Sequence, residues 1–350
     1  MSLTTSHNDT PMSAAAEKQW PARFGKVTDE FAALRSTCGV YELPQRVKIR
    51  LTGNDRVRWL NGMVTNNIKD LPQNHGVYAF LLNPQGHILG DLIAIHRGNS
   101  LLVESDQAQL AKILATFDHY IIMDDVEVAD VSDTLATIGV AGPHSAAVLG
   151  AAGIQLSPMK PLAVADLTWH DVPISVVRGE FDDFPSFEMW VAPEQVAKLR
   201  EALKNAGTTL VGQDALELYR VALGIPLYGK DIRERDLPQE TEQQHALNFS
   251  KGCYVGQEIV ERIRSRGNVH RKFTGFKIDG PPAAVGTKFQ WQGKEVGEIT
   301  SSAVIPGPTG EQSVALGYVR RELAGPNKDL DIAGSRVTVS ELPFRELLRN

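Results

Sequence analysis

The sequence predicts an α+β protein in which two regions of mixed helices and strands precede a small C-terminal domain built of strands. Three observations lead to this fold class. Residues 47–117 follow the order strand, helix, strand, strand, strand, helix, which fits helices packed on one face of an antiparallel sheet. Residues 134–223 add a second set of strand and helix patterns. From about Phe273 onward, short strand patterns are separated by turns rich in glycine and proline, which is typical of a small β-barrel or sandwich.

The first region opens with a short helix over residues 28–35, where acidic residues precede apolar residues at helical spacing. Residues 47–53 alternate apolar and charged side chains, and this pattern is typical of a half-buried strand. Two further strands, over residues 77–82 and 89–95, are separated by Asn83-Pro84-Gln85-Gly86. Because this joint contains the proline and glycine of a tight turn, we predict a β-hairpin here.

Asp91 is an acidic residue inside the otherwise apolar second strand of this hairpin. A carboxylate at such a position needs compensation for burial, which a cation or a ligand amine facing it in a cavity would provide. The alternative is an aspartate on the solvent face of the hairpin, since charged residues are mostly exposed. The sequence leaves both interpretations open.

The second region contains two strands over residues 174–178 and 187–191. Glu188 lies between two apolar neighbours, so its side chain points to the opposite face of the strand from theirs. From the sequence alone, this glutamate faces either solvent or the wall of a pocket. Farther along the chain, the mixed-charge run from Arg233 to Asp236 predicts a solvated loop.

The most distinctive stretch is Lys251-Gly252-Cys253-Tyr254-Val255-Gly256-Gln257-Glu258, which contains one of the two cysteines of the chain. Glycine adopts backbone angles that a Cβ forbids, so the paired glycines suggest a tight loop that presents Cys253. Lys251 and the basic residues between Arg262 and Lys272 would favour the thiolate and make the cysteine reactive. The alternative is a turn whose small cysteine lies in the core, since free cysteine is among the most buried residue types.

The composition is that of an ordinary globular protein and argues against several classes of function. A formal net charge of −6 makes general nucleic-acid binding unlikely to be the function. No apolar run approaches the roughly 18 residues of a membrane span. Two cysteines without a CxxC pair predict neither a disulfide framework nor a metal site. Residues 1–19 are rich in serine, threonine and alanine, so we expect a disordered leader and a cytoplasmic protein.

The chain resembles the folate-binding proteins of the YgfZ type, which are relatives of the glycine cleavage T-protein, an aminomethyltransferase. The stretch 251–258 matches the signature K-G-C-[FY]-x-G-Q-E of these proteins at every fixed position. Supporting matches are Met63-Val64-Thr65-Asn66, Asn83-Pro84-Gln85-Gly86, and Tyr219-Arg220 followed by Gly224-Ile225-Pro226. The likeness extends from about Trp20 to Leu348.

This resemblance implies three domains around a central folate pocket, two of them ferredoxin-like α/β domains and the third a C-terminal β-barrel. The expected boundaries place residues 20–50 and 131–270 in a first α/β domain that carries the cysteine motif. Residues 51–130 form the second domain, and residues 271–350 form the barrel. The implied ligand is tetrahydrofolate or another folate derivative.

The resemblance also implies roles for two carboxylates. Asp91 corresponds to the second of two aspartates in T-proteins, the catalytic acid near the folate nitrogen, whereas Gly90 replaces the first. Glu188 falls in a setting similar to that of the glutamate with which T-proteins hold the pteridine ring. A carboxylate suits that task because it can accept two parallel hydrogen bonds from the ring.

Arg220 is retained from the T-protein pattern, and we expect Asn83 and Tyr254 to complete the folate site. The chain departs from the pattern nearby, because residues 183–186 replace the T-protein loop G-E-D-G and Leu216 replaces an arginine. These departures favour folate binding over aminomethyl transfer.

Two functions follow as hypotheses. In the first, the protein binds tetrahydrofolate and supports the assembly or repair of iron–sulfur enzymes, with client or assembly proteins as partners. Cys253 would then act as a transient ligand or redox nucleophile at the pocket mouth. In the second, the protein is a folate-dependent one-carbon transferase in which Asp91 shuttles a proton. The first predicts that Cys253 is essential, and the second predicts dependence on Asp91 and indifference to Cys253. The sequence favours the first, because a T-protein has no need of the stretch 251–258. A third interpretation is a folate-binding scaffold whose basic strip between Arg262 and Lys272 docks a partner.

Overall fold

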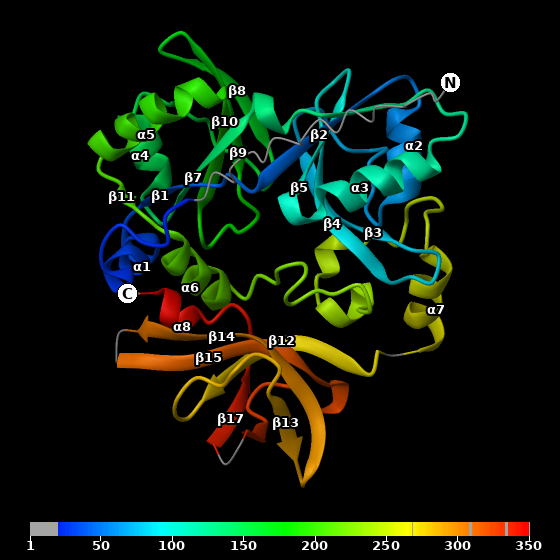
Figure 1. Cartoon of the computed structure of the whole chain (residues 1–350), viewed down its shortest axis with the longest axis vertical. Coiled ribbons are helices and arrows are strands. Elements are labelled where there is room, and N and C mark those ends of the chain that lie inside the picture. Colours follow the sequence, from blue (N-terminus) through cyan, green and yellow to red (C-terminus); the bar gives the residue numbers. More distant parts are fainter. Residues whose placement is uncertain (1–19, 268, 308–309, 333–334, 350) are drawn as a thin grey trace, which may run out of the picture.

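The structure is a computed structural model that describes residues 20–267, 269–307, 310–332 and 335–349. The expected leader at residues 1–19 lies outside the described residues. Two open sheets and a closed barrel are arranged around a common centre (Figure 1). This arrangement confirms the α+β class and the C-terminal barrel that the turn-rich sequence predicts.

The first sheet has six strands in the order β11-β1-β7-β10-β9-β8. Its strands are β1 Gly39–Glu42, β7 Ala136–Ala141, β8 Val164–Trp169, β9 Val172–Arg178, β10 Ser186–Val191 and β11 Thr209–Leu210. The helices of this part are α1 Val27–Ser36, α4 Ser145–Ala151, α5 Val196–Asn205 and α6 Gln213–Leu223, with the 3-10 turn η2 Pro193–Gln195. The helix predicted over residues 28–35 is therefore confirmed. Cys38 is buried in the apolar core between this sheet and its helices.

The second sheet has five strands in the order β3-β4-β5-β2-β6. Its strands are β2 Arg46–Thr52, β3 Gly76–Leu82, β4 Ile88–His96, β5 Leu101–Asp106 and β6 Glu127–Asp130. Helices α2 Arg56–Met63 and α3 Gln107–Tyr120 belong to this part, and the 3-10 turn η1 Ser132–Thr134 follows it. The predicted hairpin is confirmed by the antiparallel ladder of β3 and β4. The boundary expected at residue 50 falls inside β2, and the ladder of β2 to β5 places all of residues 46–52 in the second sheet.

The barrel closes in the order β12-β15-β14-β13-β16-β17. Its strands are β12 Arg271–Ile278, β13 Lys288–Trp291, β14 Lys294–Gly307, β15 Gly310–Arg320, β16 Asp329–Ile332 and β17 Ser335–Ser340. The 3-10 turn η5 Arg321–Leu323 follows β15, and helix α8 Arg345–Leu348 follows the barrel. Alternate apolar residues of these strands fill the barrel, among them Phe276, Phe289 and Val337.

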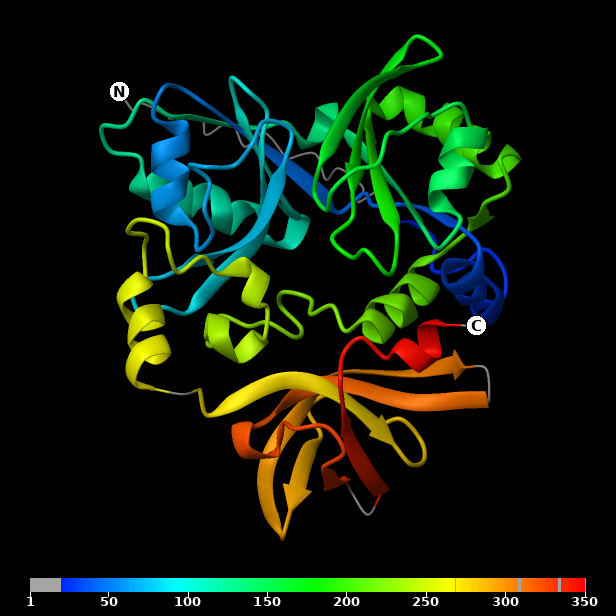
Figure 2. The ribbon, with the colours of Figure 1, turned by 180° about the vertical axis from the view of Figure 1, so that it is seen from behind.

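The segment between α6 and the barrel packs on the second sheet. It contains η3 Pro238–Thr241, η4 Gln244–Ala246 and helix α7 Gln257–Arg266, which runs along the outer edge of the molecule (Figures 1 and 2). Ile232, Leu247 and Tyr254 share one apolar core with Phe80 and Ile88 of the hairpin. The cysteine motif therefore lies against the second sheet, although we expected it in the domain of the first sheet. The reason is the apolar side of the segment, which covers residues of β3 and β4.

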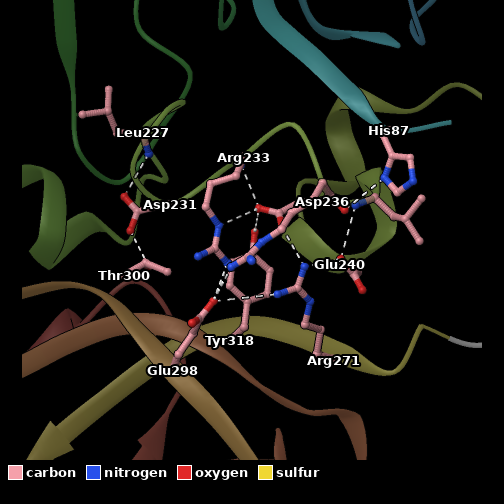
Figure 3. Close-up of polar contacts among 12 residues, drawn as sticks. His87, Leu227, Asp231, Arg233, Asp236, Glu240, Arg271, Glu298, Thr300 and Tyr318 are labelled. Atoms are coloured by element: carbon pink, nitrogen blue, oxygen red, sulfur yellow. Dashed lines mark hydrogen bonds and ion pairs between the residues drawn. The ribbon is translucent and has the colours of Figure 1, made fainter. Parts of the chain in front are cut away.

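The start of this segment forms the junction with the barrel (Figure 3). Asp236 is fully buried and accepts hydrogen bonds from the Arg271 side chain and the Arg233 backbone N–H, both at 2.7 Å. Glu298 of β14 accepts from Arg233 at 2.6 Å and pairs with Lys288. Arg233 and Asp236 thus pair with charges on the barrel, and for them the expectation of solvation is wrong. Glu234 and Arg235 between them are exposed, as expected.

In the part of the chain that the structure describes, no helix is long and apolar enough to cross a membrane.

Candidate active site in the central cavity

A cavity of about 710 Å³ lies where the three parts of the molecule meet. The second sheet contributes residues of β2, β4 and β5, and α3 adds the side chain of Gln109. The part with the first sheet contributes Tyr41, Glu180 and Phe181. Further wall comes from the segment after α6, including Gly224–Tyr228 and His245, and from Phe273 and Pro343 on the barrel side. A cavity of this size, walled by polar and aromatic side chains, suits a small-molecule ligand.

Asp91 faces this cavity from β4 and is half-buried. Its Oδ2 accepts a hydrogen bond from the Tyr78 hydroxyl at 2.7 Å, and its Oδ1 accepts one from Gln109 Nε2 at 2.7 Å. The hydrogen-bond partners of the carboxylate are therefore a phenol and an amide. Of the two interpretations that the sequence left open, the structure has the one in which Asp91 faces a cavity. Two donors from opposite sides hold the carboxylate in one orientation.

Tyr78 extends this polar wall toward the segment after α6. Its ring stacks on His245 with a centroid distance of 5.3 Å, and His245 Nε2 lies 3.6 Å from Glu180 Oε1. Burial and the neighbouring Asp91 raise the pKa of Tyr78. The hydroxyl therefore stays protonated and donates a hydrogen bond to Asp91. Burial also raises the pKa of Glu180 to about 7, with Asp91 adding to the shift and Arg46 opposing it.

A second carboxylate group lies behind Arg46 of β2. Arg46 Nε is 3.2 Å from Glu104 and its terminal nitrogen is 3.6 Å from Glu188 of β10. Burial raises the pKa of Glu188 to about 7, Glu104 adds to this shift, and Arg46 opposes it. Glu188 is therefore a half-buried residue at the contact of the two sheets, and it reaches the cavity through Arg46, which lines it.

Lys48 shows that the charged face of β2 is covered in the first half of the strand. Its side chain is fully buried, its Nζ donates to Thr137 Oγ1 at 2.5 Å, and it lies 5.1 Å from the centre of the Trp190 ring. Burial lowers the pKa of this lysine, while Glu104 and Glu188 act in the opposite direction. The alternation of residues 47–53 correctly predicts a strand, but both of its faces are covered in its first half.

Comparison with known proteins places this architecture in one family. The chain matches the GCVT N-terminal domain over residues 5–251 and the glycine cleavage T-protein C-terminal barrel domain over residues 271–344. The chain belongs to the glycine cleavage T-protein family.

Relatives in this family match nearly the full length of the chain. An aminomethyltransferase of Rippkaea orientalis is 29% identical over 346 residues, covering 93% of this chain and 91% of the relative. One of a Nostoc species is 27% identical and covers 90% of this chain and 85% of the relative. The solved glycine cleavage system aminomethyltransferase T from Bartonella henselae has a TM-score of 0.82 at 20% identity, with 95% and 96% coverage, and shows the shared fold.

Arg220 of α6, which the T-protein pattern retains, lines the central cavity of this family member. Its five N–H donors are all engaged within the protein: two by Glu217, one each by Asp231, Ser301 and the carbonyl of Ile225. Arg220 therefore joins α6 to the barrel and supports the wall of the cavity at residues 224–228.

The cysteine motif of this family member lies outside the residues that line the central cavity. Cys253 is exposed, which answers the question that the sequence left open. Lys251 does not pair with the thiol. Its Nζ donates to the backbone carbonyls of Asn61, Val64 and Asn66 at 2.5 to 2.6 Å. Burial lowers the pKa of Lys251 to about 7.

The other motif residues have local roles around this loop. Tyr254 is buried in the core beside the hairpin, and the side chain of Gln257 accepts from the Tyr254 N–H at 3.3 Å. Asn83 lies in the hairpin turn, where its side chain accepts from the His87 N–H at 3.0 Å. Neither Asn83 nor Tyr254 is among the residues that line the central cavity. Glu258 is exposed in the first turn of α7.

The end of the basic strip after the motif is paired within the molecule. Arg271 pairs with Asp236 and Glu240, and Lys272 pairs with Glu242 at 2.9 Å. These intramolecular ion pairs use charges that a docking surface would offer to a partner.

Sequence reasoning missed several residues of the cavity wall, namely Arg46, Tyr78, Glu104, Gln109, Glu180 and His245. A signal for one of them is visible in the sequence. Glu104 interrupts an apolar strand pattern, as Asp91 does, and β5 carries it opposite Lys48 of β2. Tyr78, Gln109 and His245 follow no motif and are brought together only by the packing of distant segments.

Proposed function

We propose that this T-protein family member binds tetrahydrofolate in the central cavity and transfers a one-carbon unit, in the manner of an aminomethyltransferase. The observation that carries this proposal is the position of Asp91, which two hydrogen bonds hold at the wall of a cavity about 710 Å³ in volume. The names of the full-length relatives support the same reaction.

The residues of the cavity fit a reduced folate. The pteridine ring offers an amino group and ring N–H groups, and the wall provides carboxylate acceptors at Glu104 and Glu180. Glu188 does not line the cavity and pairs with Arg46, so the role in ring binding that the resemblance implies would act through Arg46. Aromatic side chains at Tyr41 and Phe181 offer surfaces for the ring.

The catalytic part of the proposal concerns a proton at Asp91. Tetrahydrofolate, when bound, supplies the nitrogen that receives the one-carbon unit. As that nitrogen bonds the carbon, the bond between the carbon and the amino group of the aminomethyl donor breaks. The carboxylate of Asp91 accepts the proton that the nitrogen loses, as a general base, and passes it to the leaving amine, as a general acid. Tyr78 and Gln109 keep the carboxylate pointed at the cavity.

The test compares binding with transfer. Calorimetry should show tetrahydrofolate binding by the wild type, weakened at least about tenfold, which is ~1.4 kcal/mol, by Glu188→Ala. Asp91→Asn should retain binding and lose at least roughly 100-fold in transfer from an aminomethylated lipoyl carrier protein. Cys253→Ser is the control and should leave both unchanged. A wild type that binds no tetrahydrofolate would sink the proposal.

A second function is favoured by one specific observation, the exposure of Cys253 in a motif that lies outside the cavity wall. In this alternative the YgfZ-type resemblance holds, and the protein supports the assembly or repair of iron–sulfur enzymes. An exposed thiol can act as a transient ligand or nucleophile toward a partner. In cells that lack the native protein, Cys253→Ser should then fail to restore iron–sulfur enzyme activities. Restoration by Cys253→Ser but not by Asp91→Asn would reject this alternative and retain the transferase.

A further inference from the structure

We propose that Gln109 is a positioning residue for Asp91, and that Gly90 is a glycine because the Gln109 amide occupies the space of a side chain at that position. The inference rests on the proposed function, because it names the group that orients the acid used there. It concerns a pair of residues that no motif connects.

Gln109 contacts both the main chain and the side chain of Asp91. Its Oε1 accepts a hydrogen bond from the Asp91 N–H at 2.9 Å, and its Nε2 donates to Asp91 Oδ1 at 2.7 Å. The side chain of Gln109 is 3% exposed, so its amide is removed from water and uses Asp91 as its partner on both ends. A buried amide with both ends engaged is expensive to displace, since an unpaired end loses its hydrogen bond without gaining water.

The backbone of β4 leaves room for this contact. The ladder between β4 and β5 begins at Ile93. At Asp91, the side of β4 that faces β5 therefore has no partner strand. The Asp91 N–H is taken by Gln109, and the Asp91 carbonyl accepts from Ser105 Oγ at 2.8 Å. At Asp91, the side chains of Gln109 and Ser105 thus make the two backbone hydrogen bonds that a neighbouring strand would otherwise make.

Gly90 provides the space for the Gln109 amide. A Cβ placed on Gly90 would lie 2.9 Å from Gln109 Oε1 and 3.8 Å from Ile113. The nearer atom is the end of a flexible side chain, so a methyl group at residue 90 would displace the amide while leaving the backbone in place. Gly90→Ala therefore removes the contact from a position that does not itself touch Asp91's carboxylate.

Charged and titratable groups reach Asp91 from every neighbouring element. Arg46 of β2 and Tyr78 of β3 interact with it, as do Glu180 of the loop after β9 and Tyr228 of the segment after α6. Gln109 is the neutral neighbour on α3. Replacing this neutral amide with an acid therefore adds a like charge to a site that already holds Glu180.

Three variants test the proposal: Gly90→Ala, Gln109→Met, which keeps much of the volume without hydrogen bonds, and Gln109→Glu. The matched control is Gly62→Ala, because a Cβ on Gly62 meets no atom within 4 Å. We expect kcat for one-carbon transfer to fall roughly tenfold in Gly90→Ala and Gln109→Met, with KM for tetrahydrofolate within about twofold. In Gln109→Glu the acidic limb of the pH–rate profile should move to higher pH, because neighbouring carboxylates resist simultaneous ionisation.

A double variant distinguishes positioning from general damage. If Gly90→Ala acts by displacing the amide, then Gly90→Ala combined with Gln109→Met should be no slower than Gln109→Met alone. Additive losses would overturn the proposal, as would wild-type kcat in Gly90→Ala or in Gln109→Met.

A measurement without folate separates this proposal from the proposed function. The carbon-13 resonance of the Asp91 carboxyl, assigned with Asp91→Asn, can be titrated in each variant. Its midpoint should move to higher pH in Gly90→Ala and Gln109→Met, because the carboxylate loses a donor. An unchanged midpoint in both would overturn the role of Gln109. A shifted midpoint in a protein without transfer activity would reject only the proposed function.

Discussion

Gly86 and Gly256 meet backbone to backbone: a Cβ on Gly256 would lie 3.2 Å from the Gly86 Cα and 2.6 Å from the Asn83 carbonyl oxygen. Both glycines have positive φ, 75° and 81° respectively. The hairpin turn and the start of α7 therefore touch at residues without side chains. This contact joins the two motifs on which the family resemblance rests.

Gly256→Ala should lower the free energy of unfolding by about 2 kcal/mol or more, because it combines a strained backbone with a clash against a carbonyl oxygen. Chemical denaturation monitored by tryptophan fluorescence measures this loss. Gly252→Ala is the control within the same motif, since a Cβ there meets no atom within 4 Å. Equal stabilities of the two variants would contradict the contact.

Native protein should expose one reactive thiol. Cys253 is exposed, whereas Cys38 is buried in the core of the first sheet, and burial raises the pKa of the Cys38 thiol to about 12. We expect a thiol reagent to modify one cysteine per chain without denaturant and two with it. Peptide mapping identifies the modified residue. Rapid labelling of Cys38 in the native protein would show that this core opens.

The free energy of unfolding should depend on pH through the ionisation of Glu188. Burial raises its pKa from the usual value of 4.5 to about 7. Between pH 4.5 and pH 7, Glu188 is therefore protonated in the folded protein and ionised in the unfolded chain. The contribution is fully present below pH 4.5 and is lost as pH rises through 7. Relative to Glu188→Gln, the wild type should thus lose roughly 2–3 kcal/mol between about pH 4 and pH 8.

Denaturant unfolding at several pH values tests this expectation for Glu188. The exposed Glu258→Gln variant serves as the comparison and should follow the wild type at each pH. A difference between wild type and Glu188→Gln that is constant with pH would contradict the assignment.

Asp231 should be among the most sensitive positions of the barrel junction. It is fully buried and accepts hydrogen bonds from Arg220, from the Leu227 N–H, and from the hydroxyls of Thr300 and Ser301. Asp231→Ala removes one of the two carboxylates that pair with Arg220, leaving Glu217, and it also leaves the donors of Leu227, Thr300 and Ser301 without their acceptor. We expect a loss of about 2–3 kcal/mol, because buried donors become unsatisfied. Thermal and chemical unfolding should show the loss, whereas Asp182→Ala should show little, because the Asp182 side chain is 82% exposed.

Much of the fold could be predicted from local patterns, and much of the site could not. The hairpin and the barrel depend on turn residues and alternation, which are visible within a few residues of sequence. Lys48 and Asp236 could not be placed in this way, because a charge is expected in water until its partners are known. Their partners, Thr137 and Arg271, are distant in the chain.

The same limit applies to the cavity. Asp91 stood out as an acid in an apolar strand, yet the residues that hold it carry ordinary side chains at ordinary positions. Tyr78 has the pattern of a strand residue and Gln109 that of a helix residue, and neither suggests a partner. Only the packing of α3 over the edge of β4 joins Gln109 to Asp91.

The sheet that contains β1 has a consequence for the order in which the chain folds during synthesis. β1 at residues 39–42 pairs with β7 at 136–141 and β11 at 209–210, while the whole second sheet lies between β1 and β7 in sequence. On the ribosome, the five strands from residue 46 to residue 130 are complete before β1 has any partner. We expect the second sheet to form first, whereas β1, which is synthesised earlier, pairs only after β7 and β11 have been made.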